Sequence, residues 1–300
     1  MLILSKCRAP PRLCVKICGM QLNPLSQDCP AVSPYLRVSE KARLIEFLVR
    51  TFSACLLALG LVCSSRASET ADTNHFTYVI VHGAWGGSFH WRGVDDLLTA
   101  DGHKVFRAAL TGQGERSHLA STNVDLSTHI ADVANLLIWE NLHDVVLVGH
   151  SYGGMVVTGV ADRCPERIKR VVYLDAMLPE NGESARSLFH GARPGFETNG
   201  WIYPTWVKPN TPPPHDVPMS AKTFYEAIAL TNQAAAQKLL ATYILTVDKG
   251  QLPEKDMFYP FYQRAQQRHW PAWIMEADHN PHFSQPKEVA RQLERAAAVR

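Results

Sequence analysis

One stretch, residues 144–155 (DVVLVGHSYGGM), restricts what this chain can fold into more than any other. A short apolar run at 145–148 leads into Gly-His-Ser-Tyr-Gly, and a second glycine and an apolar helical pattern follow. Strand, tight turn and helix is the context in which G-x-S-x-G forms a nucleophile elbow. The residues two before and two after the serine must lack bulk, because strand and helix approach closely there. The pattern therefore predicts that Ser151 stands on a strained turn with its hydroxyl above a sheet.

Strand and helix patterns alternate through residues 71–178 and 241–300. This alternation predicts an α/β core, with a mostly parallel sheet covered by helices on both faces. Helical spacing is clearest at 88–100, around 130–137, after the elbow to about 162, at 258–267 and from 284 onward. The expected strands are buried, largely β-branched runs at 76–82, 103–109, 145–148, 170–174, 241–247 and 272–276.

Residues 179–240 break this alternation. The segment is rich in proline and aromatic residues, with helical signal from Ser220 onward. It is too long for a plain connection between two elements. We predict that it forms a lid inserted over the carboxyl ends of the strands, where ligands bind in sheets of this type.

Residues 1–70 are predicted to form an N-terminal extension without catalytic residues. The apolar run 52–63 follows Arg50 and precedes Ser-Arg-Ala at 65–67, which is the pattern of a secretory signal peptide. The run is too short to span a bilayer. The sequence therefore predicts a secreted or periplasmic protein, cleaved after Ala67, without a stable membrane anchor. As an alternative to Met1, translation could begin near Val49, which would give a compact signal peptide.

The charge of the chain is unevenly distributed. The formal charge is +2, but residues 1–67 hold 9 Lys and Arg against 3 Asp and Glu. Residues 68–300 therefore hold 21 against 25 and are mildly acidic, so no basic face for nucleic acid is indicated. A hydrophobic content of 46% and a charged content of 19% are typical of a soluble globular protein.

A serine hydroxyl needs a base to take its proton and a third group to orient that base. The chain order in this type of sheet is Ser, acid, His. After Ser151, the expected strand ends offer Asp248 in TVDKG and His279 in EADHNPH. We predict His279 as the general base and acid, and Asp248 as the carboxylate that fixes its tautomer. Asp175, at the end of the strand after the elbow, is an alternative acid, and His282 is an alternative base.

Negative charge that develops on a substrate oxygen needs preorganised hydrogen-bond donors. The backbone N–H groups of Ala84, in the loop HGAWGG, and of Tyr152, after the nucleophile, are the expected oxyanion hole. The side chains of Trp85, Met155 and Met177 are candidate walls of an apolar substrate pocket.

The remaining histidines and the metal motifs give weaker signals. His82 precedes the oxyanion glycine and is expected to hold that loop by a hydrogen bond, whereas His150 is expected to point away from the nucleophile and pack. The sequence contains neither H-E-x-x-H nor paired C-x-x-C, and the phosphate and dinucleotide signatures are absent too. We therefore predict no metal site and no cofactor.

Residues 76–300 resemble the α/β-hydrolase superfamily. The matching pieces are VHGAWGG (81–87), LVGHSYGGM (147–155), TVDKG (246–250) and ADH (277–279). Within the superfamily the chain is most similar to the plant methylesterase and hydroxynitrile lyase branch and its bacterial carboxylesterase relatives. The resemblance implies the triad of Ser151, Asp248 and His279, an oxyanion hole at Ala84 and Tyr152, and no cofactor.

The resemblance also bears on the reaction. The lyase members carry a threonine after the first loop histidine and a lysine after the catalytic histidine, where this chain has Gly83 and Asn280. These differences favour ester hydrolysis. We expect a serine esterase for small to medium apolar or aromatic substrates, including xenobiotic esters or amides. A lyase or C–C bond hydrolase on the same scaffold is the alternative, and a non-catalytic ligand receptor would be expected to lack part of the triad.

Overall fold

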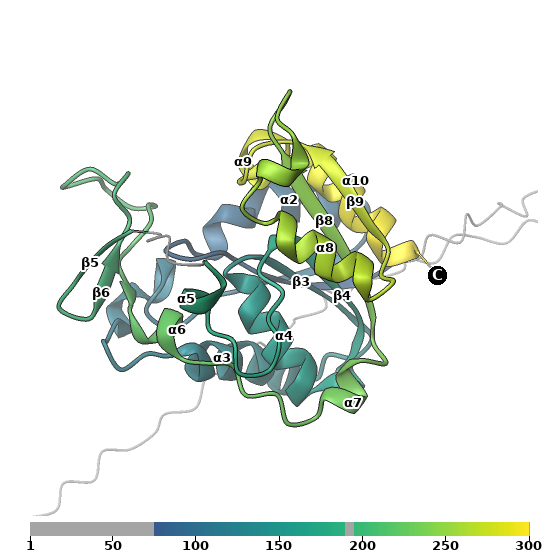
Figure 1. Ribbon diagram of the computed structural model, residues 1–300, viewed down its shortest axis with the longest axis horizontal. Coiled ribbons are helices and arrows are strands. Elements are labelled where there is room, and N and C mark those ends of the chain that lie inside the picture. The colour runs from purple at the N-terminus through teal and green to yellow at the C-terminus, as the bar shows by residue number, and fades with distance from the viewer. Residues whose placement is uncertain (1–74, 190–194, 300) are drawn as a thin grey trace, which may run out of the picture. The chain divides into compact units, whose positions relative to one another are not determined.

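A six-stranded sheet in which every neighbouring pair is parallel lies at the centre of the fold (Figure 1). The computed structural model describes residues 75–189 and 195–299, within a compact unit that runs from Asp72 to Arg300. The predicted signal segment and extension lie outside the described residues. In spatial order the strands are β2 (Lys104–Ala108), β1 (Thr77–Val81), β3 (Val145–Ser151), β4 (Ile168–Ala176), β8 (Leu240–Val247) and β9 (Ala272–Glu276).

Helices cover both faces of this sheet, which confirms the predicted fold class. The helix α2 (Arg92–Ala100) and the helix α10 (Pro286–Ala298) bury their apolar residues on one face. The opposite face is covered by α3 (Leu126–Trp139), α4 (Gly153–Arg163) and α8 (Tyr259–Gln267). Short 3-10 helices η1 (Ser88–Trp91), η2 (Gly114–Leu119), η3 (Pro165–Arg167) and η4 (Pro253–Lys255) and the short helix α9 (Pro281–Ser284) complete this part.

The strands read as continuous apolar runs because both of their faces are buried. In β1, Val79 and Val81 pack into the cluster under α3 and α4, whereas Tyr78 and Ile80 pack into the cluster under α2 and α10. Within the described residues, no helix is both long and apolar enough to cross a bilayer.

The segment between β4 and β8 departs from the alternation of strands and helices. Its described residues form a small antiparallel sheet of three strands and three short helices, seen at the left and bottom of Figure 1. These elements are α5 (Ala185–Leu188), β5 (Phe196–Thr198), β6 (Trp201–Tyr203), β7 (Met219–Ser220), α6 (Lys222–Tyr225) and α7 (Gln233–Ala236). We call residues 179–240 the inserted segment, and its role as a lid stays a prediction.

The turn from β3 to α4 is built on glycines that let backbones touch. A Cβ on Gly149 would lie 2.6 Å from Val157, and a Cβ on Gly153 would lie 2.6 Å from the carbonyl oxygen of Val81. A Cβ on Gly154 would overlap the carbonyl oxygen of Met177. The first turn of α4 therefore lies directly against the backbones of the neighbouring strands.

Replacing Gly154 by alanine tests this close packing. We expect Gly154→Ala to lower the free energy of unfolding by about 1–3 kcal/mol or more, since the backbone must shift to admit the methyl group. Gly93→Ala is the matched control, because Gly93 also lies in the first turn of a helix and its added Cβ would meet one atom of Pro286 at 3.7 Å. Alanine there should raise stability, by up to about 1 kcal/mol. Urea unfolding of both variants measures the difference, and equal midpoints would contradict the packing described here.

Candidate active site

Three side chains form a continuous hydrogen-bonded chain at the carboxyl end of the sheet. Ser151 Oγ lies 3.0 Å from His279 Nε2, and His279 Nδ1 lies 2.6 Å from Asp175 Oδ2. The carboxylate accepts from Nδ1–H, which leaves Nε2 free to accept the serine proton. A hydroxyl, an imidazole and a carboxylate are thus arranged as in a serine nucleophile with its base and orienting acid.

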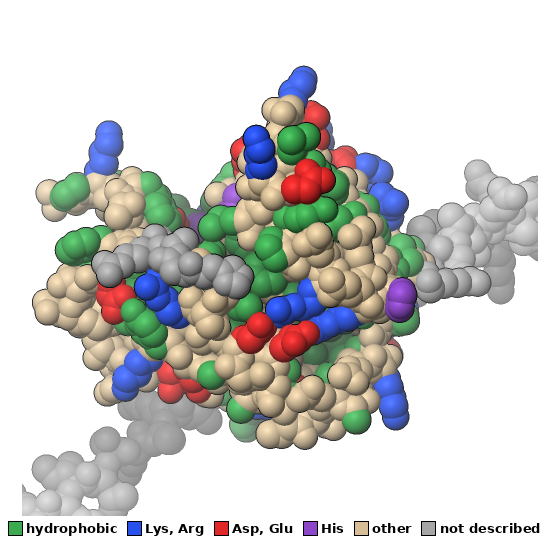
Figure 2. Space-filling model, in the orientation of Figure 1, with side chains coloured by type: hydrophobic (Ala, Val, Ile, Leu, Met, Phe, Trp, Pro, Cys, Tyr) green, Lys and Arg blue, Asp and Glu red, His purple; other side chains and the backbone are tan. Residues whose placement is uncertain are grey.

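These side chains come from three separate elements. Ser151 is the last residue of β3, Asp175 lies one residue before the end of the neighbouring β4, and His279 follows β9. Figure 2 shows the surface hollowed between the part that carries β5 and β6 and the part that carries α9. Histidine side chains, coloured purple, are visible in this hollow. Because Ser151, Asp175 and His279 lie at or just after the carboxyl ends of their strands, the group stands at the rim where α/β sheets bind ligands.

Ser151 adopts the backbone geometry predicted for an elbow. Its φ is 54°, in the left-handed region that non-glycine residues rarely adopt, and strain of this kind persists only where the surroundings enforce it. The N–H of Met177 donates to the carbonyl oxygen of Ser151 at 3.0 Å and holds it to the end of β4.

The prediction of Asp248 as the orienting acid is wrong in this structure, which places Asp175 at that position. Asp248 is exposed directly after β8, and its carbonyl oxygen accepts a turn hydrogen bond from Gln251. The side chain of Asp175 is 1% exposed, and its second oxygen accepts the N–H of Thr246 at 3.0 Å. Asp175 is the alternative acid that the sequence offers.

A β-bulge explains why Asp175 can reach the imidazole. The pairing of β3 with β4 runs from His150 with Leu174 directly to Ser151 with Ala176, so Asp175 is skipped. Bulges of this kind turn a side chain out of the regular alternation. Asp175 has a φ of 44°, and the hydroxyl of Tyr243 bonds both the N–H (3.2 Å) and the carbonyl (2.7 Å) of Ala176. The bulge is therefore stabilised from β8.

Two further residues, neither of them assigned this role from the sequence, hold His279. The ring of Phe258 stacks on the imidazole with centroids 4.7 Å apart and planes inclined by 15°. His150 Nε2 donates to the main-chain carbonyl of His279 at 2.7 Å. Burial, together with His282 and His279, lowers the pKa of His150 well below its ordinary value, so the ring is neutral. His150 was expected to pack only, whereas it also fixes the loop that carries the base.

His282, the alternative base, is 2% exposed, and in the described structure its ring packs against Trp91 rather than against Ser151. Its ring stacks on Trp91 at 4.8 Å, and neither ring nitrogen has a hydrogen-bond partner among the described residues. Burial, followed by the neighbouring His90 and His279, lowers the pKa of His282 to about 3. A ring in this state is a neutral packing element.

The loop predicted to supply the oxyanion hole lies beside the nucleophile. A Cβ on Gly83 would be 3.0 Å from Ser151 Cβ and 3.5 Å from its Oγ. His82 Nδ1 donates to the carbonyl of Gly83 at 2.8 Å, which confirms the hydrogen bond expected of this histidine. Among the described residues, the N–H groups of Ala84 and Tyr152 have no acceptor outside regular secondary structure. Their assignment as oxyanion donors stays a prediction.

The same loop is fixed to the inserted segment. Trp85, with a φ of 63°, donates from Nε1 to the carbonyl of Ile202 in β6, and its own carbonyl accepts the N–H of Val217. Next to it, Asp216 accepts from His90 Nε2 at 2.9 Å and from Trp206 Nε1 at 2.7 Å. Burial opposes ionisation of Asp216, but these two bonds outweigh it and lower its pKa.

The three candidate pocket residues are buried parts of the larger hydrophobic cluster. Trp85 is 9% exposed, Met177 1% and Met155 0%. Trp85 also contacts Phe224 and Trp206 of the inserted segment, with ring centroids 5.7 and 5.2 Å apart. Sequence reasoning missed these two aromatic neighbours because their contact with Trp85 is long-range. That any of them touches a substrate stays a prediction.

The part of the chain that the structure describes holds no group of three or more His, Cys, Asp or Glu side chains placed to bind a metal ion. The buried histidines near the site instead contact aromatic rings and one another.

Comparison with known proteins agrees with this geometry. Residues 78–292 match the model of the alpha/beta hydrolase family. The chain belongs to this family. The matched residues include the elbow at Ser151, the acidic residue Asp175 and the loop that carries His279.

Several relatives of this alpha/beta hydrolase are named as esterases, which supports a hydrolase. A carbendazim hydrolyzing esterase from Nocardioides sp. (strain SG-4G) is 50% identical over 117 residues, which is 39% of this chain and 48% of that protein. The chain thus spans about half the length of this relative. Methylesterase 3 from Arabidopsis thaliana is 25% identical over 260 residues, covering 72% of this chain and 93% of that protein.

Solved structures show the same fold. An extracellular alpha/beta-hydrolase from a Paenibacillus species superposes with a TM-score of 0.60 at 24% identity, covering 75% of this chain and 100% of that one. A pyrethroid hydrolase from Sphingobium faniae JZ-2 superposes with a TM-score of 0.57 at 22% identity, covering 75% and 98%.

The buried histidines predict that acid weakens the fold. In the unfolded chain His282 titrates near its ordinary value of 6.5, whereas in the folded state its pKa is about 3. Between these values the unfolded state binds the extra proton, so stability falls as pH decreases, by roughly 1.4 kcal/mol per pH unit for such a group. His82, with a pKa lowered to about 4 by burial, acts in the same direction.

Urea unfolding at pH 7 and pH 5 measures this effect. Wild type should lose roughly 2 kcal/mol more than His282→Phe over this interval, since the phenyl ring can keep the contact with Trp91 without a titrating group. The imidazole resonance of His282 in wild type should also stay constant from pH 5 to 8. A normal titration of that resonance near pH 6.5 would contradict the burial described here.

Proposed function

We propose that this chain is a carboxylesterase that cleaves esters of small to medium apolar or aromatic substrates through an acyl-enzyme intermediate. The observation that carries this proposal is the chain of hydrogen bonds from Ser151 through His279 to Asp175. Its support from relatives is the recurrence of esterases among them.

In the acylation step, His279 Nε2 takes the proton of Ser151 as Oγ attacks the ester carbonyl carbon. Asp175 stabilises the imidazolium that forms and holds its tautomer. We expect the amides of Ala84 and Tyr152 to bind the oxyanion, because Ala84 lies in the loop beside Ser151, Tyr152 follows it, and neither N–H has a backbone acceptor in the described part of the chain. The imidazolium then gives its proton to the departing alkoxide, and the alcohol leaves.

In the deacylation step, a water molecule takes the place of the alcohol. His279 accepts one proton from this water as its oxygen attacks the acyl carbon of the ester on Ser151. Collapse of the second tetrahedral intermediate breaks the bond to Oγ, which regains its proton from His279. The carboxylic acid is released and the resting state returns.

The position of Gly83 favours hydrolysis over cyanohydrin cleavage. Any side chain at this position would begin 3.5 Å from the nucleophilic oxygen, and glycine places no hydroxyl there. Together with Asn280, this removes the two polar side chains that the lyases carry. Product analysis with a cyanohydrin and an ester side by side separates the two reactions.

Hydrolysis of amides or xenobiotic esters on the same machinery is the second candidate. The observation that favours it is the 50% identity to the carbendazim hydrolyzing esterase over 117 residues. Acyl transfer to serine proceeds in the same way for esters and amides, so the two candidates are separated by comparing the rates with ester and amide substrates.

We also propose that residues 52–63 direct export, on the pattern of their sequence. N-terminal sequencing of the exported protein should find a start at Ser68, and an intact segment 1–48 would contradict this.

A panel of nitrophenyl esters of increasing acyl length tests the proposed function. Wild type should hydrolyse the shorter members, and Ser151→Ala should lower kcat by about 10⁶. Asp175→Asn should lower kcat by about 10⁴, because the imidazole loses its correct tautomer. Asp248→Asn is the matched control: the same change, one strand away, should leave kcat unchanged.

Two results would overturn these assignments. Equal rates in wild type and Ser151→Ala would remove the serine hydrolase mechanism. A loss in Asp248→Asn as large as that in Asp175→Asn would show that the acid in solution is not the carboxylate bound to His279 in the structure.

A further inference from the structure

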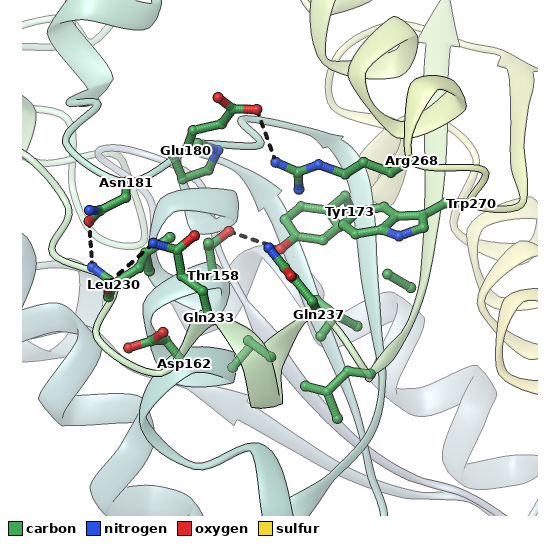
Figure 3. A pocket seen from close by; sticks show the side chains of 16 residues that line it. Thr158, Asp162, Tyr173, Glu180, Asn181, Leu230, Gln233, Gln237, Arg268 and Trp270 are labelled. Atoms are coloured by element: carbon green, nitrogen blue, oxygen red, sulfur yellow. Dashed lines mark hydrogen bonds and ion pairs between the residues drawn. The ribbon is translucent and has the colours of Figure 1, made fainter.

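A cavity of about 600 Å³ lies on a face of the sheet, away from the strand ends that carry Ser151 (Figure 3). Its floor is the middle of β4 and the start of β8, and its walls are α4 and the end of α8. Both ends of the inserted segment, at 179–181 and 230–239, close it from the side. Neither the nucleophile nor its histidine and acid lines this cavity, and its volume lies within the range of small-molecule sites.

One wall of the cavity is aromatic. The rings of Tyr173 and Trp270 stack with centroids 5.7 Å apart and planes inclined by 20°. The hydroxyl of Tyr173 bonds Thr158 Oγ1 at 2.9 Å, and Thr158 in turn donates to the carbonyl of Gly154. These hydroxyls are satisfied within the protein and Tyr173 is 3% exposed, so the wall offers a ligand chiefly the half-buried ring of Trp270.

Arg268 lies beside this wall, and among the described residues its guanidinium makes one side-chain hydrogen bond, to Glu180. Its guanidinium lies over the ring of Trp270 at 5.1 Å, and in the described residues its polar partner is Glu180 Oε1 at 3.5 Å. The Glu180 side chain is 60% exposed. Arg264, by contrast, is paired at short distance: its two terminal nitrogens donate to the two carboxylate oxygens of Glu183 at 2.6 and 3.0 Å.

The carboxylate of Asp162 does not compete for the guanidinium of Arg268. Asp162 also lines the cavity, but its oxygens accept the N–H groups of Thr231 and Asn232, both at 2.8 Å. The exposed side chain of Gln237 also lines the cavity, as Figure 3 shows. A guanidinium fork and an exposed side-chain amide beside an aromatic ring match a planar carboxylate on an aromatic ring.

We propose that this cavity is a second ligand site that binds an aromatic monocarboxylate. The ring lies against Trp270, and the carboxylate takes the place of Glu180 on Arg268. Such a ligand contacts both ends of the inserted segment at once. The proposal does not depend on the reaction at Ser151.

Equilibrium binding of 2-naphthoate to the full chain carrying Ser151→Ala tests this site. Isothermal titration should give one site, and Arg268→Gln should weaken binding about tenfold or more, since a charge-assisted pair is lost. Glu180→Gln should tighten binding, because it removes the competing carboxylate. Gln267→Ala, on the same helix but outside the cavity lining, should leave binding unchanged.

The uncharged 2-naphthamide is the matched probe. Its binding should be weaker than that of 2-naphthoate and insensitive to Arg268→Gln, whereas Trp270→Leu should weaken both probes. The opposite effects expected at positions 268 and 180 cannot arise from general loss of structure. Unchanged binding of 2-naphthoate in Arg268→Gln, weaker binding in Glu180→Gln, or no binding to the parent protein would each overturn the proposal.

Discussion

The left-handed backbone at Ser151 is the constraint on which the rest of the site depends. A serine with a φ of 54° is held there because glycines before and after it let α4 press against β1 and β4. That contact fixes the end of β4, whose Met177 donates to the carbonyl of Ser151. The bulge that turns Asp175 toward His279 lies in the same stretch of β4. The side chains of Ser151 and Asp175 are therefore positioned by one packing arrangement.

Local signals in the sequence were sufficient for the order of elements, the elbow and the pairing of Ser151 with His279. A strand that is buried on both faces requires a continuous run of apolar residues, which is visible in the sequence. The elbow requires small residues at a fixed spacing from the serine, which is visible as well. The choice between Asp175 and Asp248 could not be made in this way. Both follow apolar runs at the carboxyl ends of adjacent strands, and only the register shift between β3 and β4 separates them. Prediction from sequence assumes that side chains alternate regularly between the two faces of a strand. It therefore cannot anticipate a bulge that leaves Asp175 unpaired.

The histidines show a second limit of the sequence. The ring of His150 lies 4.9 Å from that of His279 and 4.8 Å from that of His282, centroid to centroid, yet the surroundings of His279 and His282 differ. His279 has a carboxylate on one nitrogen and a hydroxyl on the other. His282 is enclosed by rings, and burial keeps it neutral. His279 and His282 are the same residue type and lie only three positions apart in the chain. The sequence therefore cannot tell which of them contacts Ser151, because this depends on the three-dimensional surroundings of each ring.

The bond from Asp216 to His90 and Trp206 has a consequence for how this protein can diverge. Together with the bonds between Trp85 and the backbone of the inserted segment, it ties the loop beside the nucleophile to the segment around it. Changes in the inserted segment will therefore also shift the loop at 83–87, which lies beside Ser151. The two parts cannot vary independently, and a substitution in one should be accompanied by a compensating substitution in the other.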